Sequence, residues 1–315
     1  MKPFKWEKHG LIYCLDDQVS WAKGYTQMPT VDAMCDRGID IFFSSRDQLN
    51  RSLIGRLTLD RDNLKRVVDV QQSPVLELGD LGTFDDCGVM PSSLVNFEGR
   101  KYLYYIGWNV RNTVSYHNSV GLAVSEDKGL TYQKIFTGPI MDRTHDEPYF
   151  CATTCVIVEN GIWRNWYLSC TGWFVVNGKP EPRYHLKYAE SLDGINWKRS
   201  GTIAIDYVDQ NEGGIARATV IKDGSLYRMW YSYRSILNYR SDSHSSYRIG
   251  YAESSDGISW KRQDDRAGID VSGQGWDAFM LAYPEVVDID GRKFMFYNGN
   301  GFGQSGIGYA ELLAD

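Results

Sequence analysis

The chain has 315 residues, of which 43% are hydrophobic, a share that excludes a disordered chain and suffices for a sizeable core. The net charge of −6 argues against binding to nucleic acid or to an anionic membrane surface. Aromatic residues make up 14% of the sequence, including 21 Tyr and 10 Trp, which favours strands and suits stacking on sugar rings.

The N-terminal residues 1–8 contain no apolar run, and no later stretch approaches the roughly 18 apolar residues of a membrane span. We therefore expect no signal peptide, no membrane partner and a cytoplasmic location. The six cysteines fit free thiols in that compartment and form no Cys-x-x-Cys pair. We expect no cofactor and no dedicated metal site, although a calcium ion in a central channel and the oligomeric state stay open.

One segment of the sequence recurs. Residues 188–199 and 251–262 share the pattern Tyr-Ala-Glu-Ser-x-Asp-Gly-Ile-x-Trp-Lys-Arg, residues 122–134 form a looser copy, and 308–311 begin another. With a degenerate copy at 54–57, the markers are spaced by 66, 66, 63 and 58 residues. The spacing predicts five units of roughly sixty residues each.

Each unit contains the same elements in the same order. A small-residue strand comes first, then a turn such as Glu98-Gly99, then an aromatic strand, then the recurring segment and a fourth strand. The first strands are predicted at 28–31, 90–95, 152–156, 216–220 and 282–286. Four antiparallel strands per unit, repeated five times, predict an all-β, five-bladed β-propeller, and we expect residues 1–315 to form a single domain.

The two chain ends complement each other. The last unit stops after its third strand at residues 311–315, while residues 4–8 resemble the fourth strands that begin at Trp197 and Trp260. We therefore expect the N-terminal strand to complete the last blade and remove an open edge. Helical periodicity is almost absent, and the best stretch for one helical turn is 59–66.

The Asp-Gly turns of the repeat favour a structural interpretation. Asp127, Asp193 and Asp256 are expected to close tight outer turns. The aromatic residues that follow them are expected to pack between blades; they are Tyr132, Trp197 and Trp260.

Acidic residues precede four of the five innermost strands at similar offsets. They are Asp86, Glu147, Glu212 and Asp277. Innermost propeller strands line a central channel, so these carboxyl groups are expected to converge on one pocket, with capping of strand ends as the alternative role. Paired carboxylates serve glycosidic cleavage, because one donates a proton and the other activates water or attacks the sugar.

Further residues fit a sugar-binding pocket. Arg217 and His145 suit a substrate carboxylate or phosphate, and Asp277, Asp32 and Glu285 are additional substrate-binding candidates. Aromatic residues near the predicted loop mouths suit stacking on sugar or, equally, packing between blades; they are Trp21, Tyr25, Trp108, Trp173, Tyr233 and Trp276.

The repeat, the acids before the inner strands and the closing strand resemble the five-bladed glycosidases of glycoside hydrolase families 43 and 32, and more distantly family 130. Residues 212–214 look like a family 43 general-acid segment, and residues 87–91 are similar to a family 130 stretch in which Met90 replaces an acid. The resemblance implies Glu212 as general acid, Asp86 as base or nucleophile and Glu147 as the residue that tunes the acid.

The first unit departs from those families, because its inner strand reads Tyr25-Thr-Gln-Met-Pro29 and lacks their aspartate. Asp32 lies later and Asp16 and Asp17 lie earlier. The sequence therefore predicts a glycoside hydrolase-like enzyme acting on a small saccharide or glycoconjugate. Two alternatives stay open: a glycosyl transferase or phosphorylase, and a carbohydrate-binding propeller without catalysis.

Overall fold

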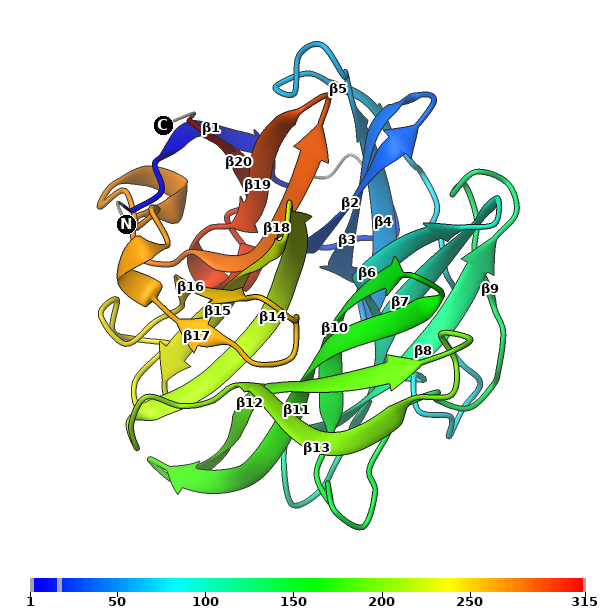
Figure 1. Ribbon diagram of the computed structural model, residues 1–315. Helices are drawn as coiled ribbons and strands as arrows, with labels where there is room; N and C mark the ends of the chain where they lie inside the picture. Colours follow the sequence, from blue (N-terminus) through cyan, green and yellow to red (C-terminus); the bar gives the residue numbers. More distant parts are fainter. Residues whose placement is uncertain (1–2, 16–18, 314–315) are drawn as a thin grey trace.

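The computed structural model describes residues 3–15 and 19–313 and is built almost entirely from strands (Figure 1). The helical segments in this part of the chain are short: η1 (Asp264–Arg266), η2 (Gly275–Asp277) and α1 (Asn300–Gly303). None of the helices in the described ranges is long and apolar enough to cross a membrane. The all-β class predicted from the repeat is confirmed.

The strands form antiparallel four-stranded units in chain order. The first unit contains β2 (Gln27–Cys35), β3 (Gly38–Arg46), β4 (Ser52–Leu59) and β5 (Val67–Val70), and the second contains β6 (Val89–Phe97), β7 (Arg100–Val110), β8 (Tyr116–Ser125) and β9 (Gln133–Lys134). The third contains β10 (Cys151–Glu159), β11 (Ile162–Val176), β12 (Lys179–Ser191) and β13 (Lys198–Ile205). The fourth contains β14 (Glu212–Asp223), β15 (Leu226–Ser235), β16 (Arg248–Ser254) and β17 (Lys261–Arg262), and a single parallel pairing of Tyr184 with Gly214 joins it to the third.

The last unit combines the two ends of the chain. It contains β18 (Ala282–Ile289), β19 (Arg292–Asn298), β20 (Ile307–Leu312) and β1 (Trp6–Tyr13). β1 pairs antiparallel with β20, with Trp6 opposite Leu312, and both termini lie beside this unit (Figure 1). The N-terminal strand thus takes the fourth position of the last unit, as the complementary ends predict.

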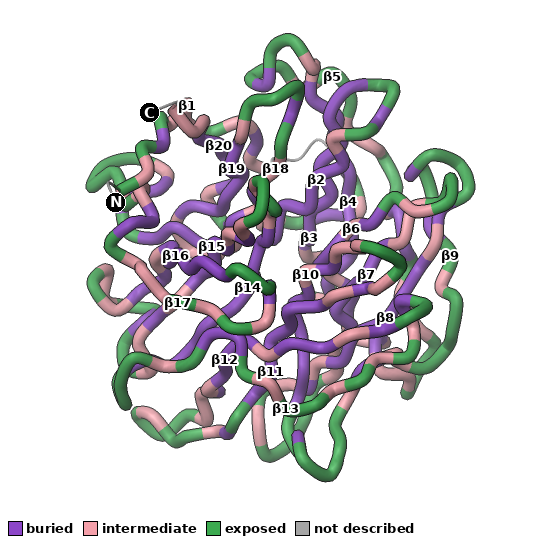
Figure 2. The backbone as a smooth tube through the Cα atoms, in the orientation of Figure 1, coloured by how far each residue is buried: buried purple, intermediate pink, exposed green. Residues whose placement is uncertain are grey.

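The first strands of the units contact one another in a cycle: β2 with β6, β6 with β10, β10 with β14, β14 with β18 and β18 with β2. Figure 2 shows buried residues along these central strands and exposed residues mainly in the connecting loops. Each of these inner strands contains an irregularity in register near its start, and such bulges redirect side chains. The arrangement is β-propeller-like.

Aromatic side chains join neighbouring units. Trp197 of the third unit packs edge-on against Tyr104 of the second, with ring centroids 6.1 Å apart, and Trp260 packs against Trp166 at 6.0 Å. Tyr132 contacts Phe42 of the first unit at 5.5 Å. The predicted packing of these residues between units is confirmed.

The Asp-Gly turns are held by local hydrogen bonds. The carboxylate of Asp193 accepts the amide protons of Ile195 and Asn196 at 2.9 and 2.8 Å, and Asp127 and Asp256 make equivalent contacts. These bonds replace the backbone pairing that the tight turn interrupts. The structural interpretation of these aspartates is confirmed.

The helical turn expected at 59–66 is absent, because this stretch forms consecutive turns after the end of β4. Asp60 accepts the amide proton of Asp62, and Asn63 accepts that of Lys65. Such side-chain bonds to the local backbone compete with the helical pattern.

Candidate active site

Three of the four acids predicted before the inner strands, Glu147, Glu212 and Asp277, are buried, and each binds residues within its own unit. Glu147 accepts hydrogen bonds from Tyr167 and Ser169, both at 2.9 Å, and lies 3.7 Å from Arg199 on the fourth strand β13. Asp277 accepts a bond from Tyr297 and forms a 2.8 Å ion pair with Lys8 on β1. In both units, the acid that precedes the first strand therefore binds a cation on the fourth strand.

Glu212 also binds a cation on the fourth strand of its unit, and it does so through both carboxylate oxygens. Both of its carboxylate oxygens bind Arg262 of β17, at 2.6 and 2.7 Å, and Oε2 also accepts the amide proton of Val208. A two-point bond of this kind fixes the orientation of the carboxylate.

In the second unit, the residue at the common position is Asp85 rather than Asp86. Asp85 accepts a bond from Tyr105 at 3.0 Å and pairs with Lys134 of β9 at 2.6 Å. Asp86 instead accepts hydrogen bonds from the amide of Gly82 in the preceding loop and from the side chain of Asn109 on β7. Burial raises the pKa of Asp86, but these hydrogen bonds outweigh it and bring the pKa below the ordinary value. Asp85 thus occupies the position that was predicted for Asp86, one residue later in the sequence.

A pocket of about 420 Å³ lies over the start of the inner strands. Every inner strand contributes to its lining, through Met28, Met90, Ala152, Ala216 and Tyr283. Concave sites with several aromatic walls and a few polar groups are the usual form of a small-molecule site. This pocket is therefore the candidate active site.

Nine of the 21 residues that line the pocket are aromatic. They are Tyr25, Trp108, Tyr116, Phe150, Tyr184, Tyr239, Tyr247, Tyr283 and Phe302. Tyr116 and Phe150 also contact Trp173 behind them, with centroids 5.4 and 5.8 Å away. Rings held in this way are rigid flat surfaces suited to the apolar faces of sugars.

The charged residues among the described lining are two arginines, Arg46 and Arg240, and this lining contains no carboxylate. Arg240 lies 3.4 Å from Glu181, outside the lining. A third arginine, Arg234, is buried behind the wall, where its guanidinium donates to Tyr184 Oη at 3.1 Å and to the carbonyls of Pro182 and Ser235. The pocket is therefore aromatic and cationic.

Arg217 and Glu285 lie next to the pocket floor. Arg217 of β14 donates from Nη2 to Glu285 of β18 and to Thr30 of β2, both at 3.0 Å. Its amide also donates to Thr153, a pocket residue. Arg217 thus reaches toward the other inner strands, as strand alternation predicts, and Glu285 shares its environment.

Burial raises the pKa of Glu285, and the nearby Arg217 only partly opposes this effect. The carboxyl side chain is 16% exposed. A partly accessible carboxyl group with a raised pKa holds its proton at higher pH than an ordinary glutamate.

The remaining predicted residues lie at different places. Trp108 lines the pocket, and its indole donates to Ser52 at 2.6 Å. His145 is outside the lining, with a side chain that is 90% exposed and pairs with Asp146. Trp276 stacks on Tyr297 at 5.1 Å and is also outside the lining.

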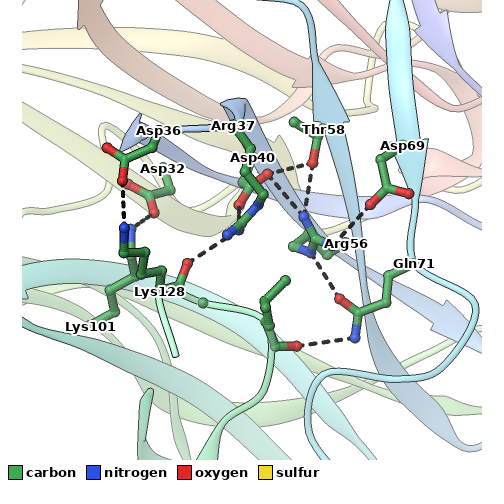
Figure 3. Close-up of polar contacts among 12 residues, drawn as sticks. Asp32, Asp36, Arg37, Asp40, Arg56, Thr58, Asp69, Gln71, Lys101 and Lys128 are labelled. Atoms are coloured by element: carbon green, nitrogen blue, oxygen red, sulfur yellow. Dashed lines mark hydrogen bonds and ion pairs between the residues drawn. The ribbon is translucent and has the colours of Figure 1, made fainter. Parts of the chain in front are cut away.

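Asp32 lies four residues further along β2 than the pocket residue Met28. Its carboxylate pairs with Lys101 and accepts a bond from Asn96, so it links the first two units (Figure 3). The same figure shows Asp40 bound to Arg37 and Arg56 within the first unit. Asp16 and Asp17 lie outside the described residues.

Several pocket residues were not predicted, including Arg46, Tyr116, Tyr184, Tyr239 and Tyr247. Arg46 and Tyr116 lie at strand ends, Tyr184 lies within β12, and Tyr239 and Tyr247 lie in the loop between β15 and β16. One signal was available: Arg46 and Trp108 both lie at or near the ends of second strands, β3 and β7. Within the described ranges, no three His, Cys, Asp or Glu residues are arranged to hold a metal ion.

Comparison with known proteins gives both sequence relatives and fold relatives. No family model matches the chain. Two proteins of Mycobacterium tuberculosis, named Uncharacterized protein MT1551 (strain CDC 1551 / Oshkosh) and Uncharacterized protein Rv1502 (strain H37Rv), are each 34% identical over 307 residues. The match covers 98% of this chain and 99% of each relative.

Solved structures of three glycoside hydrolase families share the fold. A thermostable family 43 enzyme is 18% identical, with 94% of this chain and 90% of that chain covered and a TM-score of 0.62. A family 32 β-fructofuranosidase of Bombyx mori is 14% identical, with 96% and 61% covered and a TM-score of 0.64. A family 130 structure, from work on mannoside phosphorylases and β-1,2-mannosidic hydrolases, is 15% identical, with 98% and 94% covered and a TM-score of 0.67.

The resemblance to the fold of these families is confirmed, while identities this low show the fold alone. The two mycobacterial relatives match over nearly the whole chain. The chain therefore belongs to one family with the M. tuberculosis proteins MT1551 and Rv1502, and it has the fold of the glycoside hydrolases of families 43, 32 and 130.

Proposed function

We propose that residues 1–315 form one five-bladed propeller closed by β1, and that the chain is a carbohydrate-active protein that binds a saccharide in the pocket over the inner strands. The cycle of contacts among the inner strands and the pairing of β1 with β20 support the ring. The observation that carries the binding function is the 420 Å³ pocket, which draws aromatic walls from loops of several units.

Binding is the function that the lining supports most directly. Stacking on rigid rings such as Trp108 and Tyr116 supplies affinity without a charge on the sugar. Polar groups such as Asn50 and Asn118 offer hydrogen bonds to hydroxyls. The fold relatives supply an independent reason to expect a carbohydrate ligand.

A second candidate function is cleavage of a glycosidic bond, and Glu285 favours it. A general acid must keep its proton near neutral pH, and burial raises the pKa of this group beside the pocket floor. Glu212 is less suited to that role, because both of its oxygens are held by Arg262. Cleavage by the usual two-carboxylate route also requires a second acid, which the described lining does not supply.

A glycan array followed by calorimetry tests the binding function. We expect Trp108→Ala to weaken saccharide binding at least tenfold, because it removes a stacking surface. The matched control is Trp276→Ala, which removes an indole outside the pocket lining and should leave affinity unchanged. Equal affinities for the wild type and Trp108→Ala, or no glycan bound by the wild type, would contradict the proposal.

Turnover of the bound glycans tests the second candidate. If Glu285 is the general acid, Glu285→Gln should reduce product formation at least a hundredfold while affinity stays within about threefold. Binding without product in the wild type favours the non-catalytic function. Dependence of turnover on phosphate or a nucleotide would indicate the transferase or phosphorylase alternative.

A further inference from the structure

Arg46 is a cation in the pocket without an anionic partner. It ends β3, and no ion pair joins it to a carboxylate of the described chain. The neighbouring carboxylate of Asp47 is engaged elsewhere, since it binds Arg51 at 2.7 Å and accepts the amide protons of Leu49 and Arg51. The carboxylate of Asp47 therefore does not pair with Arg46.

The guanidinium of Arg46 is fixed in place with most of its donors unused. Its Cζ lies over the ring of Trp108, 5.1 Å from the centroid, and Nη1 donates to the carbonyl of Asn50 at 3.2 Å. Five N–H groups are available on a guanidinium, so this bond leaves several for a ligand. Stacking on an aromatic face keeps the donor edge of an arginine free for two-point recognition of an oxyanion.

The surroundings leave this charge unscreened. Burial lowers the pKa of Arg46 below its ordinary value, because the charged form loses solvation. Arg240, which pairs with Glu181, is the second arginine of the lining, and the buried Arg234 lies behind the wall, bound to neutral oxygens. Desolvated cations of this kind gain most from an oxyanion that enters the pocket.

This local charge is opposite in sign to that of the whole molecule, whose net charge is −6. An acidic protein repels anions over most of its surface, so an anionic ligand requires a specific reason to bind. The arginines of the pocket supply that reason.

We propose that the pocket selects a saccharide bearing an oxyanion, a carboxylate or a phosphate, and that Arg46 is the residue that recognises this group. The inference rests on the proposed saccharide-binding function and names its substrate class. The aromatic wall would hold the sugar ring while Arg46 binds the oxyanion.

The test compares glucose, glucuronate, glucose 6-phosphate and inorganic phosphate as probes, with binding followed by tryptophan fluorescence and calorimetry. We expect at least one of the two anionic sugars to bind at least tenfold more tightly than glucose at low salt, with the difference shrinking as salt screens the charges. The anionic sugar that binds more tightly identifies the group as carboxylate or phosphate.

Arg46→Gln should abolish that preference. The matched control is Arg292→Gln, whose side chain is 63% exposed and paired with Glu311 on the last unit, and it should keep the preference. Thermal unfolding of each variant establishes that it is folded.

The possible failures can be told apart. Equal affinity for neutral and anionic sugars, or a preference that survives in Arg46→Gln, overturns the anion selectivity and leaves the saccharide pocket in place. Absence of binding by every sugar overturns the proposed function. Binding of inorganic phosphate that disappears in Arg46→Gln would still support the anion site.

Discussion

Arg217 Nη2 lies 3.0 Å from Glu285 Oε2, and this contact joins the inner strand of the fourth unit to that of the last unit. The side chain of Arg217 is only 1% exposed. Its Nη2 also binds Pro29 and Thr30 of the first unit. One guanidinium therefore ties three inner strands together beneath the pocket.

Removing one partner of this pair should destabilise the protein strongly. We expect Glu285→Ala to lower the free energy of unfolding by about 1–3 kcal/mol, because the buried Arg217 loses a hydrogen-bond partner. The double variant Arg217→Met with Glu285→Met should lose less than the two single variants together. Urea unfolding measures these differences, and simple additivity of the two single changes would contradict the coupling.

The pH dependence of stability should also reveal Glu285. Its pKa is raised above the ordinary 4.5, so the folded protein binds this proton more tightly than the unfolded chain does. The resulting contribution to stability is fully present below pH 4.5 and is lost as pH rises through the folded pKa. We expect the free energy of unfolding of the wild type to fall relative to that of Glu285→Gln over this rise, and parallel curves would refute the assignment.

We expect Glu212 to stabilise the folded protein. Since both oxygens bind Arg262 and the glutamate side chain is only 5% exposed, Glu212→Ala should cost about 3–5 kcal/mol. Saccharide affinity of the folded variant should not change. Glu126→Ala is the matched control, because Glu126 forms an exposed pair with Arg100 and its loss should cost at most about 1 kcal/mol. A stable Glu212→Ala variant that has lost turnover would instead support the general-acid role.

Asp127 should make the protein sensitive to acid. Burial acts to raise the pKa of Asp127, but hydrogen bonds from Thr131, Ser125 and Leu130 outweigh it and lower the pKa to about 2. A depressed pKa stabilises the fold above the ordinary value of 3.8, and this contribution disappears as pH falls toward 2.

We therefore expect Asp127→Asn to lower the unfolding temperature at pH 7, with the gap from the wild type closing between pH 4 and pH 2. Asp146→Asn serves as the control, because that side chain is 82% exposed and lies outside the turns. A gap that stays constant with pH would show that the carboxylate charge of Asp127 is not the cause.

The sequence was most informative where one local motif repeats. The Ser-x-Asp-Gly turns, the aromatic residues after them and the complementary chain ends were predicted because each depends on bonds or packing that the repeat itself encodes. The common position of the acids before the inner strands is also found in the structure. Glu147 and Asp277 each accept a hydrogen bond from a tyrosine on the second strand of their unit.

The sequence by itself determined the repeating strands, the turns that close them and the joining of the chain ends, because hydrophobic alternation and turn chemistry act over short distances. Only the tertiary structure decided the direction of the acidic side chains: the cation that captures Glu212 lies fifty residues away on β17, and that of Asp277 lies on β1. The pocket was decided in the same way, since Arg46, Trp108 and Tyr247 meet only when separate units are packed around one axis. Spacing along the sequence predicts the position of a residue on its strand, whereas the orientation of its side chain depends on the partners that the fold places beside it.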